Sequence, residues 1–177
     1  MWCVGHRSCG RFFMELRGQH AVSFQAVRAL AIECHALDLS AYDLLLFPVH
    51  NDSRGLTRTT YDELLTSKML ALAIALRTKF YQGVPHEGTE SYLAHVCAYE
   101  QERKGTAESH LTLKDACDKI IHADSVVRQF KEEQQRPLTI LTGVAQDKAK
   151  WTLSFSLAHF ADSILWWLED VEASAVQ

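Results

Sequence analysis

One short segment of the chain carries a carboxylate and an imidazole at helical spacing. Asp118 and His122 are four residues apart, and that separation places both side chains on one face of a helix. Histidine moves protons near neutral pH, and a carboxylate beside it can orient its ring. The pair therefore suits general acid–base chemistry. The alternative is a structural one, in which His122 ends a helix and interacts with the helix dipole while Asp118 lies on a solvated face.

A helix is expected to position this pair. Thr112 followed by Asp115 has the form of a helix start, and the helix should reach about His122. The apolar side chains that would form its buried stripe are Leu113, Ala116, Cys117, Ile120 and Ile121.

The sequence from Cys117 to His122 resembles the signature of HEPN-domain proteins, which is Arg, then Asn, Asp or His, then three residues, then His. Asp118 and His122 occupy the second and last positions, and Cys117 replaces the arginine. The resemblance covers this six-residue motif and a helix-rich stretch from about Thr60 to Ala123. It implies a metal-independent RNase of prokaryotic toxin–antitoxin or defence systems, often a dimer whose motifs face each other.

The missing arginine weakens the expectation of nuclease activity. In the family, that side chain stabilises charge on the phosphate, and losing one such donor commonly costs on the order of 100 to 1000-fold in rate. Cys117 cannot supply a cation, so another residue would have to do so. The candidate catalytic residues are therefore His122 and Asp118, with Lys119, Arg77 or Arg128 as the replacement cation.

Apolar spacing predicts three further helices before this segment. The first covers about residues 20–37, and residues 41–50 should form a connector that Pro48 stops. A capping box at Thr60–Glu63 should begin a central helix that runs to residue 82, and a third helix is expected over residues 89–104.

The hydrophobic period changes towards the C-terminus. Residues 151–157 alternate apolar and polar, which indicates a strand, and residues 137–144 and 125–131 could pair with it. A final helix is expected over about residues 159–171. The predicted fold is mainly α: a helical bundle with a small antiparallel β-meander near the C-terminus, in the α+β class.

Length and composition indicate one domain. The chain has 177 residues, of which 47% are hydrophobic. We expect residues 14–177 to form a single globular domain and residues 1–13 to be an upstream extension or disordered. The formal charge of −4 is a poor basis for nonspecific nucleic-acid binding. Five irregularly spaced cysteines favour a reducing cytoplasm, and no apolar run is long enough for a membrane span.

Other groups of polar residues have simpler explanations. The N-terminal Cys3, His6 and Cys9 offer three metal ligands where a structural zinc site needs four. The loop from His50 to Arg58 could hold phosphate or a metal, but turn chemistry explains it as well. Two further groups could join the motif's cleft, namely His86, Glu87 and Glu90 after Pro85, and His95, Tyr99 and Glu102 on one side of the expected third helix.

These observations lead to two hypotheses of different classes. The first is a HEPN-like binding or regulatory module, not a competent nuclease, that works in the cytoplasm without a cofactor or metal. The second is a metal-independent RNase that uses His122 and Asp118. Expected partners are a second copy of the chain, another protein or RNA. Trp166 and Trp167 point to different faces of the last helix, so one of them could lie in a dimer interface.

Overall fold

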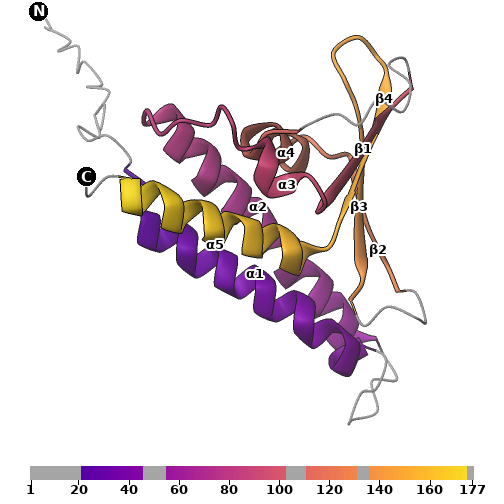
Figure 1. The fold of residues 1–177 in the computed structure, drawn as a ribbon. Helices are drawn as coiled ribbons and strands as arrows, with labels where there is room; N and C mark the ends of the chain where they lie inside the picture. Colours follow the sequence, from indigo (N-terminus) through magenta and orange to yellow (C-terminus); the bar gives the residue numbers. More distant parts are fainter. Residues whose placement is uncertain (1–20, 46–54, 103–110, 131–135, 175–177) are drawn as a thin grey trace, which may run out of the picture.

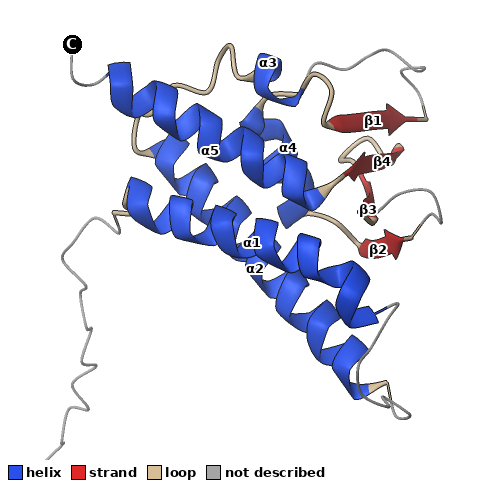
Figure 2. Cartoon of the chain, turned by 60° about the horizontal axis from the view of Figure 1, so that its bottom comes forward, coloured by secondary structure: helices blue, strands red, loops and turns tan. Residues whose placement is uncertain are grey.

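A computed structural model of the chain describes residues 21–45, 55–102, 111–130 and 136–174. Within these ranges it contains three long helices, two short helices and a four-stranded antiparallel sheet, so the predicted α+β class is confirmed. Figure 1 shows the three long helices lying side by side, with the sheet at one end of them. Figure 2 shows the same separation of helices and strands from a second direction.

The long helices are α1 (Phe24–Leu45), α2 (Leu56–Tyr81) and α5 (Leu157–Ser174). Helix α1 packs against both α2 and α5. It runs antiparallel to α2, because Glu33 of α1 pairs with Lys68 of α2 at 2.7 Å, and Lys79 near the end of α2 lies 4.0 Å from the ring of Phe24 at the start of α1. No helix within the described residues is long and apolar enough to span a bilayer.

Two helix boundaries differ from the predictions. Helix α1 continues to Leu45, because Ala41 extends the buried stripe of the helix into the segment that was expected to be a connector. Helix α2 begins at Leu56 after Gly55, which has a φ of 65°. The expected capping box at Thr60–Glu63 is therefore wrong, since both residues lie inside the helix.

The prediction of a third helix over residues 89–104 is also wrong. Only α3 (Glu90–Leu93) is helical there, and β1 (Cys97–Gln101) follows it. The spacing of Tyr92, Val96 and Tyr99 fits a helix, but residues 97–101 also alternate in burial, as a strand requires. Residues 97–101 form a strand and not a helix because they pair with β4, where Tyr99 lies opposite Leu153.

The predicted meander is present with one additional strand. Its strands are β2 (Ser125–Gln129), β3 (Leu138–Val144) and β4 (Lys150–Phe155), and the sheet order is β1-β4-β3-β2. One face of the sheet supplies Leu141, Leu153 and Phe155 to the common core. Helix α5 begins directly after β4, so the chain returns from the sheet to the helices as predicted.

Candidate functional site

Helix α4 (Leu113–Ile121) carries the Asp118–His122 pair, and its start is capped as predicted. The Asp115 amide donates to Thr112 Oγ1 at 3.0 Å, and the Thr112 amide donates to Asp115 Oδ2 at 3.1 Å. Leu113, Ala116, Cys117 and Ile120 are buried against the core. This stripe fixes the rotation of the helix, and Asp118 and His122 lie outside it.

Asp118 forms ion pairs through both of its carboxylate oxygens. Arg77 Nε lies 2.8 Å from Oδ1, and Lys114 Nζ lies 3.4 Å from Oδ2. Each of the three side chains is between 27% and 28% exposed. The guanidinium of Arg77 also donates through Nη2 to the Tyr81 hydroxyl at 3.1 Å. Helix α2 therefore places Arg77 beside Asp118, which is where the sequence hypothesis needed a cation. The guanidinium is, however, already bound to the Asp118 carboxylate and to the Tyr81 hydroxyl.

His122 caps the C-terminal end of α4. Its backbone amide donates to the Asp118 carbonyl at 3.1 Å, and its side chain is exposed. Among the described residues no carboxylate bonds to the imidazole. The Asp118 carboxylate is occupied by its two cations, so it does not orient the His122 ring in this arrangement.

The other residues of the motif face away from Asp118. Lys119 Nζ lies 5.0 Å from the Tyr99 ring centroid and 4.7 Å from that of Trp151, so its ammonium makes cation–π contacts with the sheet. Cys117 is completely buried, and burial raises the pKa of its thiol. Neither side chain replaces the missing arginine.

Arg128 is part of a different cluster, which the sequence interpretation missed. Its guanidinium donates to Asp38 Oδ1 at 2.5 Å and to Thr139 Oγ1 at 2.8 Å, and its side chain is only 7% exposed. Asp38 is completely buried and also accepts the Ala158 amide at 2.8 Å and the Ser156 hydroxyl at 3.3 Å. This carboxylate thus binds the N-terminal end of α5. Arg128 is not available to the motif.

A signal for this buried pair was present in the sequence. Asp38 falls on the stripe of α1 formed by Val27, Ala31, Cys34 and Ala41, where every other side chain is small or apolar. A carboxylate in such a stripe requires a buried cation or several donors. The position of Asp38 therefore indicates a partner, although only the fold identifies it as Arg128.

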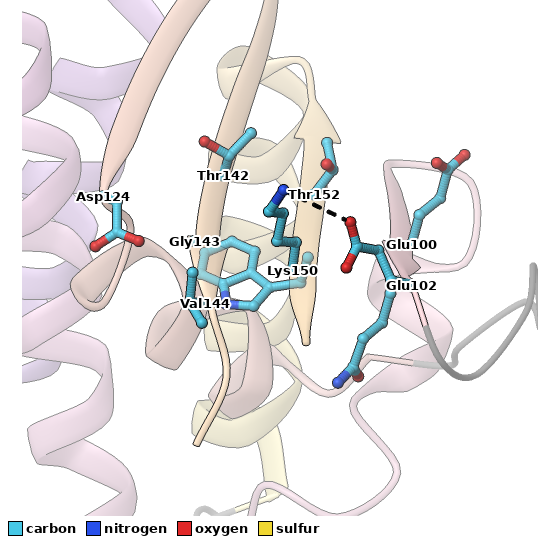
Figure 3. Close-up of a pocket in the computed structure, with 10 residues that line it drawn as sticks. Glu100, Glu102, Asp124, Thr142, Gly143, Val144, Lys150 and Thr152 are labelled. Carbon is cyan, nitrogen blue, oxygen red and sulfur yellow. Dashed lines mark ion pairs between the residues drawn. The ribbon is translucent and has the colours of Figure 1, made fainter. Parts of the chain in front are cut away.

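A depression of about 600 Å³ lies at the end of the sheet where β3 turns into β4 (Figure 3). Its charged lining residues are Glu100, Glu102, Asp124 and Lys150. Glu102 and Lys150 form a long ion pair of 4.0 Å, drawn as a dashed line in Figure 3. Asp124 follows His122 by two residues, and its amide donates to the Thr142 carbonyl at 2.8 Å, which attaches the end of α4 to β3.

Of the remaining candidate residues, Tyr99 contacts α4 through the ammonium of Lys119, 5.0 Å from its ring centroid. His95 is exposed ahead of β1, and Tyr99 and Glu102 lie on or beside that strand instead of on a helix. His86 packs edge-on against Phe80 and lies 3.8 Å from Glu87. Across the described ranges, no group of three or more His, Cys, Asp or Glu side chains could hold a metal ion.

Some predicted features lie outside the described residues. These are the segment 1–13 with Cys3, His6 and Cys9, and the loop from His50 to Arg54. Arg58 is in the first turns of α2, where it pairs with Asp62 at 3.9 Å. On the last helix, Trp167 is 2% exposed and Trp166 is 58% exposed, so the two indoles do point to different faces.

Comparison with known proteins gave no match of any kind. No family model, no curated protein and no solved structure matches the sequence.

Proposed function

We propose that this chain is a binding or regulatory module, HEPN-like around α4, and not a competent nuclease. The observation that carries the proposal is the pairing of both Asp118 oxygens with Arg77 and Lys114. An RNase that uses His122 would need Asp118 free to orient the imidazole and a cation free to bind phosphate. Here both oxygens of the carboxylate are engaged by the two cations.

A protein partner fits the chain better than RNA does. The formal charge is −4, and nucleic-acid affinity depends largely on clustered basic residues that neutralise phosphates. Lys119 and Arg128 are turned into the fold, where they contact aromatic rings and Asp38 respectively. We further propose a homodimer and a location in the cytoplasm, where the buried thiols of Cys34 and Cys117 would remain reduced.

The second candidate function is the metal-independent RNase. It is favoured by the exposed imidazole of His122 and by the delivery of Arg77 to within 2.8 Å of Asp118. In this mechanism His122 is the general acid or base, Asp118 orients it, and Arg77 leaves the carboxylate to bind the phosphate.

Cleavage of RNA in EDTA separates the two functions. A panel of structured and single-stranded RNAs would be incubated with the wild type, with His122→Ala and with Asp118→Asn, after circular dichroism has verified that each protein is folded. We expect no cleavage by any of the three. Cleavage by the wild type that His122→Ala abolishes would establish the nuclease and overturn the proposed module. Cleavage that survives in His122→Ala would identify a contaminant.

A further inference from the structure

Helices α1 and α2 carry most of the large apolar side chains that the described structure leaves exposed. On α1 these include Ile32 and Leu39, which are 54% and 44% exposed. On α2 they include Leu64, Leu70 and Ile74, which are 43%, 38% and 49% exposed. Single exposed apolar residues are common in proteins, but a set concentrated on two adjacent helices marks an interaction surface.

These side chains lie off the buried stripes of α1 and α2. Helix α1 lies between α5 and α2, to which it is tied by the ion pairs His35–Asp162 and Glu33–Lys68. Its buried stripe points to the core, so the opposite stripe faces outwards. We call the resulting surface the α1–α2 outer face; it consists of Ile32, Ala36 and Leu39 on α1 and Leu64, Leu70 and Ile74 on α2.

The two ends of the α1–α2 outer face differ in the sign of their net charge, since Arg58 at the acidic end is paired with Asp62 at 3.9 Å. Because the two helices are antiparallel, Asp43 near the end of α1 and Glu63 in the first half of α2 lie towards the same end. Both residues are exposed. Arg77 lies towards the opposite end, and with Lys114 and Asp118 it forms a cluster of one net positive charge.

This pattern is complementary to itself. A two-fold axis lying in the plane of the interface and perpendicular to α2, passing near Leu70 and Ile74, would place the apolar centres of two copies in contact. It would also place the acidic end of each copy over the basic end of the other, as an isologous interface requires. Within α2, Glu63 and Arg77 are each seven residues from Leu70, which is about two turns of helix. When the two-fold axis passes at Leu70, Glu63 of each copy therefore lies over Arg77 of the other copy.

We infer that the α1–α2 outer face binds a second copy of this chain. The inference rests on the proposed homodimer and names its surface. It assigns the contact to α1 and α2, whereas the last helix was the candidate in the sequence. Trp166 of α5 already packs against Tyr92, with ring centroids 5.1 Å apart, and stands as a single large apolar side chain on the exposed side of its helix.

Sedimentation equilibrium of the full chain at concentrations between about 1 and 100 μM tests this inference. This concentration range covers the usual dissociation constants of a specific dimer. Ile74→Glu and Ile32→Glu should each raise the dimer dissociation constant by about 100-fold or more, because they place a charge at the centre of the interface. Trp166→Glu and Val127→Glu are the matched controls, on α5 and β2, where 58% and 49% of the side chains are exposed. They should leave the constant unchanged.

A charge variant tests the second half of the argument. Glu63→Arg places a cation over the basic end of the partner copy, so it should weaken the dimer while leaving the helix folded. A dimer that only Trp166→Glu weakens would overturn the inferred surface and leave the proposed homodimer in place. A wild type that stays monomeric throughout would overturn both. Neither result would bear on the absence of nuclease activity, which the EDTA experiment measures separately.

Discussion

The most decisive test of the fold concerns the buried pair of Asp38 and Arg128. In Asp38→Asn the side chain keeps its size and loses its charge, which leaves the Arg128 guanidinium without its carboxylate at a site where only 7% of its side chain is exposed. The new carboxamide would retain one carbonyl oxygen for the Ala158 amide, which donates to Asp38 at 2.8 Å in the wild type. The variant therefore removes the ion pair while preserving much of the local packing.

The expected loss follows from the burial of both partners. Removing one member of a buried ion pair costs about 3–5 kcal/mol, since the remaining charge is uncompensated. A domain is stable by about 5–15 kcal/mol, so Asp38→Asn should still fold but unfold at clearly lower urea concentration. Adding Arg128→Met to Asp38→Asn should recover part of the loss, because the unpaired buried cation is then removed.

Urea unfolding followed by tryptophan fluorescence and circular dichroism measures these differences. The control is Glu33→Gln, which breaks the half-exposed pair with Lys68 and should cost less than about 1 kcal/mol. If Asp38→Asn cost no more than this control, the pair would not be buried as described. Losses from Asp38→Asn and Arg128→Met that simply add in the double variant would also refute the argument, since contacting residues should be coupled.

Two further substitutions test the packing around the same core. In Gly143→Ala the new Cβ would lie 2.3 Å from Trp151 Cζ2; the indole must move, and unfolding in urea should show a loss of about 1–3 kcal/mol, whereas an unchanged midpoint would contradict this contact. In Tyr61→Phe the loss of the hydrogen bond to the Leu37 carbonyl at 2.8 Å should cost about 1 kcal/mol at neutral pH. Burial raises the pKa of Tyr61 from 10 to about 12, so its stabilising contribution is complete below pH 10 and is lost as the pH rises towards 12. The wild type should therefore lose its advantage over Tyr61→Phe in that range, and a constant difference between them up to pH 12 would contradict the buried phenol.

The sequence predicts α4 well because several local signals agree there. The cap of Thr112 and Asp115 is a short-range hydrogen-bonding pattern, and the apolar stripe of Leu113 to Ile120 has a single period. Both depend on residues within two turns of one another. The rotation of the helix, which leaves Asp118 outside the buried stripe, follows from this local information.

The third helix could not be predicted in the same way. The segment from Tyr92 to Gln101 is compatible with a helical period and with an alternating one, so local spacing does not decide between them. The deciding interaction is the ladder between β1 and β4, in which Cys97 lies opposite Phe155. That contact joins residues far apart in the chain, and the pattern of a single segment does not contain it.

The same distinction explains why the motif could be located from the sequence but its chemistry could not. Three cations were candidates to replace the missing arginine, and sequence spacing does not say which of them reaches Asp118. In the fold each of these three cations has a different partner. Arg77 pairs with Asp118, as Lys114 also does. Lys119 lies against the rings of Tyr99 and Trp151, and Arg128 pairs with Asp38. Each of these cations is engaged by a group within the chain, so phosphate would have to displace an existing partner before it could bind. The apolar surface on α1 and α2 requires no such displacement, and for this reason we expect this protein to act through contacts with protein.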